Sequence, residues 1–426
     1  MLLAFCITLS LLAAGPQAEA VFMLKLDAAK VAEIAQGATP DQAILDVLTV
    51  PQGSQLLETP LTELQPLPAD SQLNLNRWII LRVPGAAGSV ESLQALRKVL
   101  AKSPVVSAIE IDYEASGHVA AEKTTPPGEE PLPAGDVRPN DPLFPLQYYH
   151  RRIQTPHAWR LTTGSPHITV AVLDTGSNME IDDLAGRGLP GYDFINNTSE
   201  VCDEGGHGTS ITALIAATGD NGVGIAGVDW NCRILPIVMT SGGAGVWAQA
   251  IEFAIARGAH VINISGKLEQ PEPSAMLESL LEQAKSAGIV IVASAGNQNA
   301  AQLSWPASSP HVIAVGAMDG FGGRWRNPMN GNGSNYGPGL DIVAPGAEIV
   351  SLSAMGARSG GEGTSAAAAL VSGACALMLG INPSLTPDQV QEILQETAFK
   401  MAGEKDEFGA GLLNVGAAVE AAANAG

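Results

Sequence analysis

The chain has 426 residues, which is more than one typical domain needs and enough for two. Apolar residues make up 46% of the sequence, so a sizeable core can form. The formal net charge of −21 argues against nucleic acid or an anionic membrane as a partner, because both require a basic patch.

The N-terminus has the pattern of a secretion signal. Residues 2–14 form an apolar stretch too short to span a membrane, and Ala18-Glu19-Ala20 has the small residues of a cleavage site. No Lys or Arg precedes the apolar stretch, so a buried helix remains the alternative. We expect residues 1–20 to be a signal peptide and the protein to be secreted or periplasmic. No later stretch reaches 18 apolar residues, which predicts a soluble mature chain with no membrane partner.

Residues 21–114 show an α+β pattern. Strands are predicted at 78–83 and 105–112, with apolar residues at helical spacing over 90–100 between them. Residues 115–140 are rich in Pro, Gly, Glu and Ala without periodicity, which predicts an exposed linker.

The remaining segment, residues 141–426, alternates strand and helix patterns. Strands are predicted at 168–173, 233–238, 260–264, 289–293 and 311–316. Helices are predicted at 208–217, 244–257, 274–287, 364–379 and 387–397. The strands are nearly continuous apolar runs, as in sheets covered on both faces, so we expect a doubly covered parallel α/β domain.

Three short motifs present an acid, a base and a nucleophile in that chain order. Asp174 lies in Leu-Asp-Thr-Gly after a predicted strand, His207 in Gly-His-Gly-Thr, and Ser365 in Gly-Thr-Ser-Ala before an Ala-rich helix. A serine hydroxyl needs an adjacent base to act as a nucleophile, and a helix N-terminus favours nearby negative charge. Alone, Ser365 would be read as a helix N-cap and His207 as a polar loop residue. In combination they match one of the orders in which Ser-His-Asp triads occur.

These motifs resemble the subtilisin-like serine proteases, the subtilase family, from about residue 141 to about residue 416. The resemblance implies an α/β fold with a mostly parallel, doubly covered sheet and a calcium-stabilised serine endopeptidase. It assigns Ser365 as nucleophile, His207 as general base and Asp174 as the acid that orients it. It also implies that Asn297, in Ser-Ala-Gly-Asn after the strand at 289–293, donates to the oxyanion.

The resemblance gives the N-terminal segments a role as well. Residues 21–114 resemble a subtilase propeptide, which assists folding and inhibits the enzyme; an unrelated adaptor domain is the alternative. We therefore expect a self-inhibited zymogen that is cut in the linker, with peptide or protein substrates and its own propeptide as partners. We expect the mature enzyme to be a monomer.

The substrate-binding residues implied by the resemblance are Ser265, Gly266, Lys267, Ala295 and Gly296. An extended peptide would pair with the segment 265–268 by strand addition, and Lys267 places a charge near it. The helix after the nucleophile lacks the Met, Pro and His that the family usually has there. The sequence therefore predicts the type of reaction more directly than its specificity.

A calcium site is implied at Asp141, Asp183 and Asn221, with carbonyls from the loop 219–225. Hard oxygen ligands suit calcium, and solvated loop carboxylates are the alternative reading.

Other functional classes have less support. A relative that binds peptides without cleaving them would not need all four catalytic positions filled. An aspartic protease needs a second Asp-Thr-Gly or Asp-Ser-Gly motif, and an esterase of the α/β-hydrolase type needs Gly-x-Ser-x-Gly; the sequence has neither.

Removal of the signal would leave three cysteines, Cys202, Cys232 and Cys375. Cys375 is expected to be buried in a helix. Cys202 and Cys232 either form a disulfide or are two buried free thiols.

Overall fold

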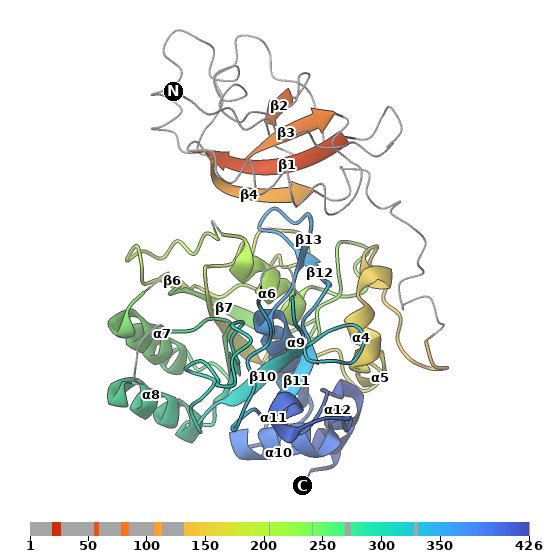
Figure 1. Ribbon diagram of the computed structural model, residues 1–426, viewed down its shortest axis with the longest axis vertical. Helices are drawn as coiled ribbons and strands as arrows, with labels where there is room; N and C mark the ends of the chain where they lie inside the picture. The colour runs from red at the N-terminus through yellow and green to blue at the C-terminus, as the bar shows by residue number, and fades with distance from the viewer. Residues whose placement is uncertain are drawn as a thin grey trace. The chain divides into compact units, whose positions relative to one another are not determined.

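The computed structural model describes four strands in the N-terminal part of the chain and most of the remainder (Figure 1). The described residues are 19–26, 55–58, 78–84, 106–112 and 132–425, apart from 204, 241, 269–273 and 328–330. The chain forms two compact units, Met1–Thr124 and Thr125–Gly426.

The N-terminal unit contains an antiparallel sheet of order β2-β3-β1-β4. Its strands are β1 (Glu19–Leu26), β2 (Gln55–Glu58), β3 (Trp78–Pro84) and β4 (Val106–Asp112). The two predicted strands are confirmed as β3 and β4, whereas β1 and β2 were not predicted. The predicted helix at 90–100, the apolar stretch at 2–14 and the linker up to residue 131 lie outside the described residues.

β1 overlaps the predicted cleavage motif Ala18-Glu19-Ala20, because the strand begins at Glu19. Val21 pairs with Arg82 of β3 and with Asp112 of β4, and the pairing continues to the end of the strand. Cleavage after Ala20 would therefore leave most of this central strand in the unit.

The C-terminal unit is built on a seven-stranded parallel sheet of order β11-β10-β9-β8-β5-β7-β6. Its strands are β5 (Thr169–Asp174), β6 (Tyr192–Asp193), β7 (Arg233–Val238), β8 (Val261–Ile264), β9 (Val290–Ser294), β10 (Ile313–Met318) and β11 (Ile342–Pro345). Five of these confirm the predicted strands to within two residues at each end. β8, β9, β10 and β11 are buried along their whole length, as their continuous apolar sequence predicts.

Helices cover both faces of this sheet (Figure 1). The helices α7 (Ala244–Ala256) and α8 (Ala275–Ser286) pack together on one face. The helices α6 (His207–Ala216) and α9 (Thr364–Ile381) pack together on the other. All four were predicted, as was α10 (Pro387–Thr397). The remaining elements are short or terminal: η2 (Phe144–Leu146), α4 (Tyr148–Arg152), α5 (Thr155–Ala158), β12 (Ile349–Leu352), β13 (Arg358–Gly361), α11 (Lys405–Phe408) and α12 (Val415–Asn424).

The central helix α9 corrects one expectation from the sequence. Its 18 residues are long and apolar enough to cross a membrane by length and composition alone. However, 83% of this stretch is buried in the unit, where α9 contacts β5, β8, β9, β10 and β11. Its apolar character is therefore that of a core helix packed against a sheet.

The order of the sheet determines where a site can form. β5 lies between β7 and β8. After β5 the chain adds β6 and β7 on one side of it and then β8 on the other side, so the strand order reverses at β5. Open α/β sheets bind ligands at the carboxyl ends of strands flanking such a switch point. Asp174 ends β5, Ser265 follows β8 directly, and Asn297 follows β9 after two further residues.

Candidate active site

Asp174 and His207 are in contact at the carboxyl end of the sheet. Asp174 is 2% exposed, and the His207 side chain, on the first residue of α6, is 45% exposed. His207 Nδ1 lies 2.7 Å from Asp174 Oδ1. Because an ionised carboxylate can only accept hydrogen bonds, Nδ1 carries the proton and Nε2 is the acceptor in the neutral ring. The charge of Asp174 raises the pKa of His207, and the partial removal of the ring from water opposes this rise.

Asp203 and Thr175 fix the start of the helix that carries His207. Asp203 Oδ1 accepts hydrogen bonds from Thr175 Oγ1 at 2.7 Å and from Gly206 N–H at 2.8 Å, and Oδ2 accepts from Thr209 N–H at 2.6 Å. Sequence reasoning missed both residues. The available signal was an Asp shortly before a predicted helix, since Asp is among the preferred residues for capping helix N-termini.

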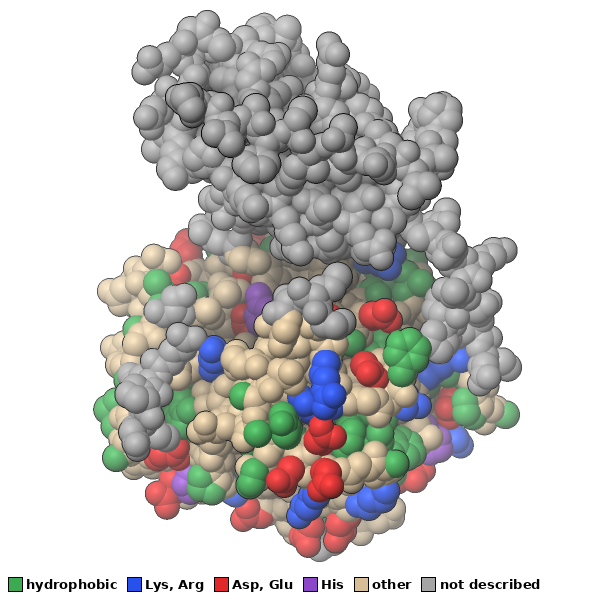
Figure 2. All heavy atoms as spheres, in the orientation of Figure 1, with side chains coloured by type: hydrophobic (Ala, Val, Ile, Leu, Met, Phe, Trp, Pro, Cys, Tyr) green, Lys and Arg blue, Asp and Glu red, His purple; other side chains and the backbone are tan. Residues whose placement is uncertain are grey.

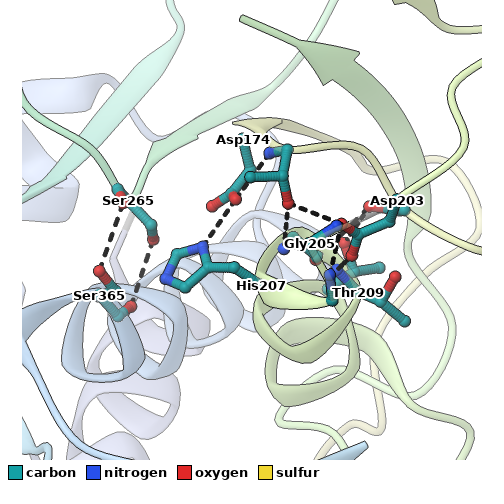
Figure 3. A network of polar contacts seen from close by, with 12 residues as sticks. Asp174, Asp203, Gly205, His207, Thr209, Ser265 and Ser365 are labelled. Atoms are coloured by element: carbon teal, nitrogen blue, oxygen red, sulfur yellow. Dashed lines mark hydrogen bonds and ion pairs between the residues drawn. The ribbon is translucent and has the colours of Figure 1, made fainter. Parts of the chain in front are cut away.

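Ser365 is the second residue of α9, and its side chain is partly buried. Its Oγ donates to the backbone carbonyl of Ser265 at 3.3 Å, and Ser265 Oγ donates to the Ser365 carbonyl at 3.3 Å. Figure 3 shows the ring of His207 between Asp174 and Ser365. The structure thus brings together the three motifs from β5, α6 and α9.

Asn297 is tied to the same end of α9. Its Oδ1 accepts from Thr364 N–H at 2.9 Å and from Thr364 Oγ1 at 2.8 Å. Its Nδ2 faces Gly363, where an added Cβ would lie only 3.0 Å away. The amide orientation is therefore set by two bonds on its oxygen edge, which leaves its N–H edge directed toward the backbone just before Ser365.

Two of the predicted substrate-binding residues, Ser265 and Gly296, form hydrogen bonds with the start of α9. Ser265 is 8% exposed and touches Ser365, Gly266 is partly buried, and Lys267 is exposed. The backbone groups of Ala295 and Gly296 are already bonded within the unit. Ala295 N–H donates to Val315 and its carbonyl accepts from Ser304, while Gly296 N–H donates to Thr364 Oγ1 and its carbonyl accepts from Asn335. The N–H groups of these two residues are therefore already used within the unit, and their role in substrate binding stays a prediction.

The three predicted calcium ligands also come together. Asn221 Nδ2 donates to Asp183 Oδ1 at 2.8 Å, and Asp141 accepts from the backbone N–H groups of Asp220 and Asn221 at 2.8 and 3.3 Å. Burial raises the pKa of both carboxyls, and that of Asp183 rises to about 6, with the charge of Asp141 adding to it. Hydrogen bonds from Ile225 N–H and Asn221, together with the charge of Arg187, offset part of this rise at Asp183. Two neighbouring buried carboxylates still suit a cation that prefers oxygen ligands.

The donor set has two limits. Among the described residues no group of three or more His, Cys, Asp or Glu side chains has the arrangement of a metal site. The cluster therefore provides two carboxylates and one amide, with loop carbonyls as further candidates. Asn221 Oδ1 accepts from Val223 N–H at 2.7 Å, so the amide would have to turn to present oxygen to a cation.

The three cysteines that follow the predicted signal are all free, which settles the open question about Cys202 and Cys232. Cys202 is exposed, whereas Cys232 and Cys375 are buried, so only Cys375 and Cys232 match the expectation of buried thiols. Burial raises the pKa of the Cys375 thiol to about 12, which keeps it protonated and unreactive.

Comparison with known proteins identifies the class that this fold and site define. Residues 165–411, more than half of the chain, match the model of the subtilase family, peptidase S8. The chain belongs to this family and is a serine-type endopeptidase. The predicted family and the predicted α/β fold with a mostly parallel sheet are thereby confirmed.

Individual relatives agree with this assignment. The chain is 35% identical over 281 residues to the thermophilic serine proteinase of Bacillus sp. (strain AK1), covering 65% of this chain and 68% of that protein. It is 36% identical over 271 residues to Subtilisin Savinase of Lederbergia lenta, covering 63% and 96%. It is 33% identical over 287 residues to Thermitase of Thermoactinomyces vulgaris, covering 66% and 99%.

A solved structure gives the same result for the fold. The solved structure of a protease from Pseudoalteromonas arctica superposes with a TM-score of 0.61 and 30% identity. The match covers 67% of this chain and 100% of that one.

Proposed function

We propose that the protein cleaves peptide bonds through an acyl-enzyme on Ser365, with His207 as general base and Asp174 as its orienting carboxylate. The observation that carries the proposal is the 2.7 Å contact between Asp174 and His207, with the imidazole ring between Asp174 and Ser365 (Figure 3). This arrangement supports a base that is fixed in one tautomer beside a hydroxyl at a helix N-terminus.

The reaction follows from these positions. Ser365 Oγ attacks the carbonyl carbon of the peptide while His207 Nε2 takes its proton, and Asp174 stabilises the imidazolium. His207 then protonates the leaving amine, and water repeats the sequence on the acyl-enzyme. Ser365 Oγ must first turn from the Ser265 carbonyl toward Nε2, and such hydrogen bonds often tighten only when substrate binds.

The oxyanion of the tetrahedral intermediate would be held by Asn297 Nδ2 and the backbone N–H of Ser365. The fixed amide of Asn297 and the position of Ser365 at the N-terminus of α9 support this role, because preorganised donors need no rearrangement during reaction. The peptide chain would pair with the segment 265–268, next to Ser365.

The N-terminal segments complete the proposal. Residues 1–20 would direct secretion or export to the periplasm, residues 21–114 would act as propeptide, and cleavage in the linker 115–140 would release a monomeric enzyme. A small antiparallel sheet in a unit separate from the protease supports a propeptide over a continuous extension of the enzyme.

Calcium would bind at Asp141, Asp183 and Asn221. The two neighbouring buried carboxylates and the Asn221 amide between Asp183 and the loop support this site, and a bound cation would stabilise the loop 219–225 without taking part in the reaction.

The test uses a fluorophosphonate probe, which forms a covalent bond to an activated serine. The secreted wild type, a Ser365→Ala copy and a Ser359→Ala control on β13 are incubated with the probe and analysed by intact mass. We expect a shortened wild type labelled at Ser365, a labelled Ser359→Ala copy, and an unlabelled Ser365→Ala chain of full length after signal removal. A folded, linker-cleaved wild type that takes no label would contradict the role of Ser365 and favour peptide binding without cleavage.

A further inference from the structure

Asp203 is a buried carboxylate that accepts four hydrogen bonds. It is 6% exposed. Its Oδ1 accepts from Thr175 Oγ1 at 2.7 Å, Gly206 N–H at 2.8 Å and Gly205 N–H at 3.2 Å, and its Oδ2 accepts from Thr209 N–H at 2.6 Å. No Lys or Arg forms an ion pair with it in the described part of the chain. Its charge is therefore held by backbone N–H groups and one hydroxyl.

These donors belong to the two elements that carry the catalytic pair. Gly206 is the N-cap of α6, directly before His207, and Thr209 is the third residue of the helix, two positions after His207. Thr175 follows Asp174, and its backbone N–H donates to Asp174 Oδ1 at 2.7 Å. One carboxylate thus bonds both the segment just after β5 and the first turn of the His207 helix (Figure 3).

The Thr175 hydroxyl makes a second link between the same elements. It donates to Asp203 and accepts from Gly208 N–H at 2.9 Å, next to His207. The contacts form a closed frame from Asp174 through Thr175 and Asp203 to the first turn of α6. Rotation or translation of this turn, which would move the imidazole from Asp174, has to break charge-assisted hydrogen bonds.

Asp203 also acts on His207 through its charge. Asp174 has the largest effect in raising the pKa of His207, and Asp203 adds a smaller one. Among the described residues these two carboxylates are the titratable groups that act on the imidazole. A neutral side chain at Asp203 would weaken the stabilisation of the imidazolium that forms during catalysis.

We propose that Asp203 is a positioning residue for the hydrolysis, which holds His207 in line between Asp174 and Ser365 and stabilises its protonated form from behind the triad. The proposal rests on the proposed role of His207 as general base. It adds a second carboxylate, acting through backbone and charge without touching the substrate.

The test is an Asp203→Asn substitution. The asparagine side chain has nearly the same shape as the aspartate but carries no charge. Its NH2 group must also face at least one of the N–H or O–H donors that now bond to Asp203. We expect kcat per titrated active site to fall by roughly tenfold to 100-fold, with KM nearly unchanged, because the base is displaced while the peptide site is intact. The acidic limb of the kcat/KM profile should move to lower pH, because the pKa of His207 falls when a nearby negative charge is lost.

Substitutions of Thr175 separate orientation from charge. Thr175→Val removes the hydroxyl link but leaves Asp203 ionised, so we expect a lower kcat with an unchanged acidic limb. Thr175→Ser keeps the hydroxyl and should restore most of the kcat. These variants test the frame even where Asp203→Asn fails to fold.

Asp193→Asn is the matched control. Asp193 is 5% exposed and accepts from the backbone N–H groups of Ile195 and Asn196 at 2.8 and 2.9 Å, but it lies on the edge strand β6. It should keep the wild-type kcat and acidic limb. The proposal would be overturned if Asp203→Asn had the kcat and the acidic limb of the wild type. It would also be overturned if the variant contained fewer active sites that can be titrated but had an unchanged kcat per active site. Full activity of a His207→Ala copy would instead overturn the proposed function itself.

Discussion

Asn297 is bound through one edge of its amide and leaves the other directed at the proposed oxyanion site. We predict that Asn297→Ala lowers kcat by about 100- to 1,000-fold with little change in KM, because the lost donor would act mainly in the transition state. Steady-state kinetics on active-site-titrated enzyme measures this. Thr364→Val is the control, since it removes the two hydrogen bonds of Thr364 Oγ1, to Asn297 Oδ1 and from Gly296 N–H, but keeps both the Asn297 amide and the Thr364 N–H donor, and it should cost less. Equal losses in the two variants would show that Asn297 acts only through packing.

The charge of Asp174 gives a prediction about pH. Its contact raises the pKa of His207 above the ordinary value of 6.5. A protonated imidazole cannot take the Ser365 proton, so kcat/KM should rise with pH through a pKa above 6.5. Asp174→Asn should lower kcat by about 10⁴-fold, because the amide no longer favours the tautomer with the proton on Nδ1. A pH profile of wild type with its acidic limb below 6.5 would contradict this account.

Sequence motifs identified some residues of the candidate site and missed others. Asp174, His207, Ser365 and Asn297 each stand in a local pattern of four residues beside a predicted strand or helix, so they could be named without coordinates. Asp203 and Thr175 stand in no such pattern, because their importance depends on which backbone N–H groups converge on them in three dimensions. The bond of Ser365 to Ser265 joins residues a hundred positions apart and likewise required the fold.

At the level of elements, the turn into α9 depends on Gly363. Its φ of +141° and ψ of 171° lie in a region that only glycine adopts easily. We predict that Gly363→Ala lowers the free energy of unfolding by about 1–3 kcal/mol and also lowers kcat, because the new Cβ would press on Asn297 Nδ2. Urea denaturation in a Ser365→Ala background measures the first effect without autolysis. Gly361→Ala, on β13 with no neighbour within 4 Å of the new Cβ, should change neither quantity.

The loop 219–225 provides a second prediction at this level. If calcium binds at Asp141, Asp183 and Asn221, saturation at about 100 times the Kd adds about 2.7 kcal/mol, which corresponds to roughly 5–10 °C in Tm. Chelation should therefore lower the Tm of a Ser365→Ala chain by about that amount, whereas Asp183→Asn should lower the Tm and abolish the response. Asp193→Asn should retain the response to chelation. A Tm of the Ser365→Ala chain that does not change on chelation would rule out the site.

The length of an element explains only part of what the sequence could predict, since β8 has four residues and was predicted whereas β1 has eight and was not. β7 and α10 have the predicted bounds, because each has a clear apolar pattern and a clear start signal, such as Thr386 and Pro387 before α10. β6 has two residues and β11, β12 and β13 have four each, which is too short for a periodicity. The strand order was also beyond the sequence, because parallel pairs join segments that lie far apart in the chain.

For the whole molecule, the proposed zymogen makes maturation an intramolecular step. Because the linker is part of the same chain as the active site, its effective concentration at that site is about millimolar. The linkers of other chains are present at only about micromolar concentration, so each chain should cleave its own linker. We therefore predict that the wild type loses residues up to the linker 115–140 with a half-time that does not change on tenfold dilution. Intact mass over time, from freshly refolded chain, measures this. The Ser365→Ala chain should stay uncut alone, and a wild-type half-time that lengthens in proportion to dilution would show that chains cleave one another instead.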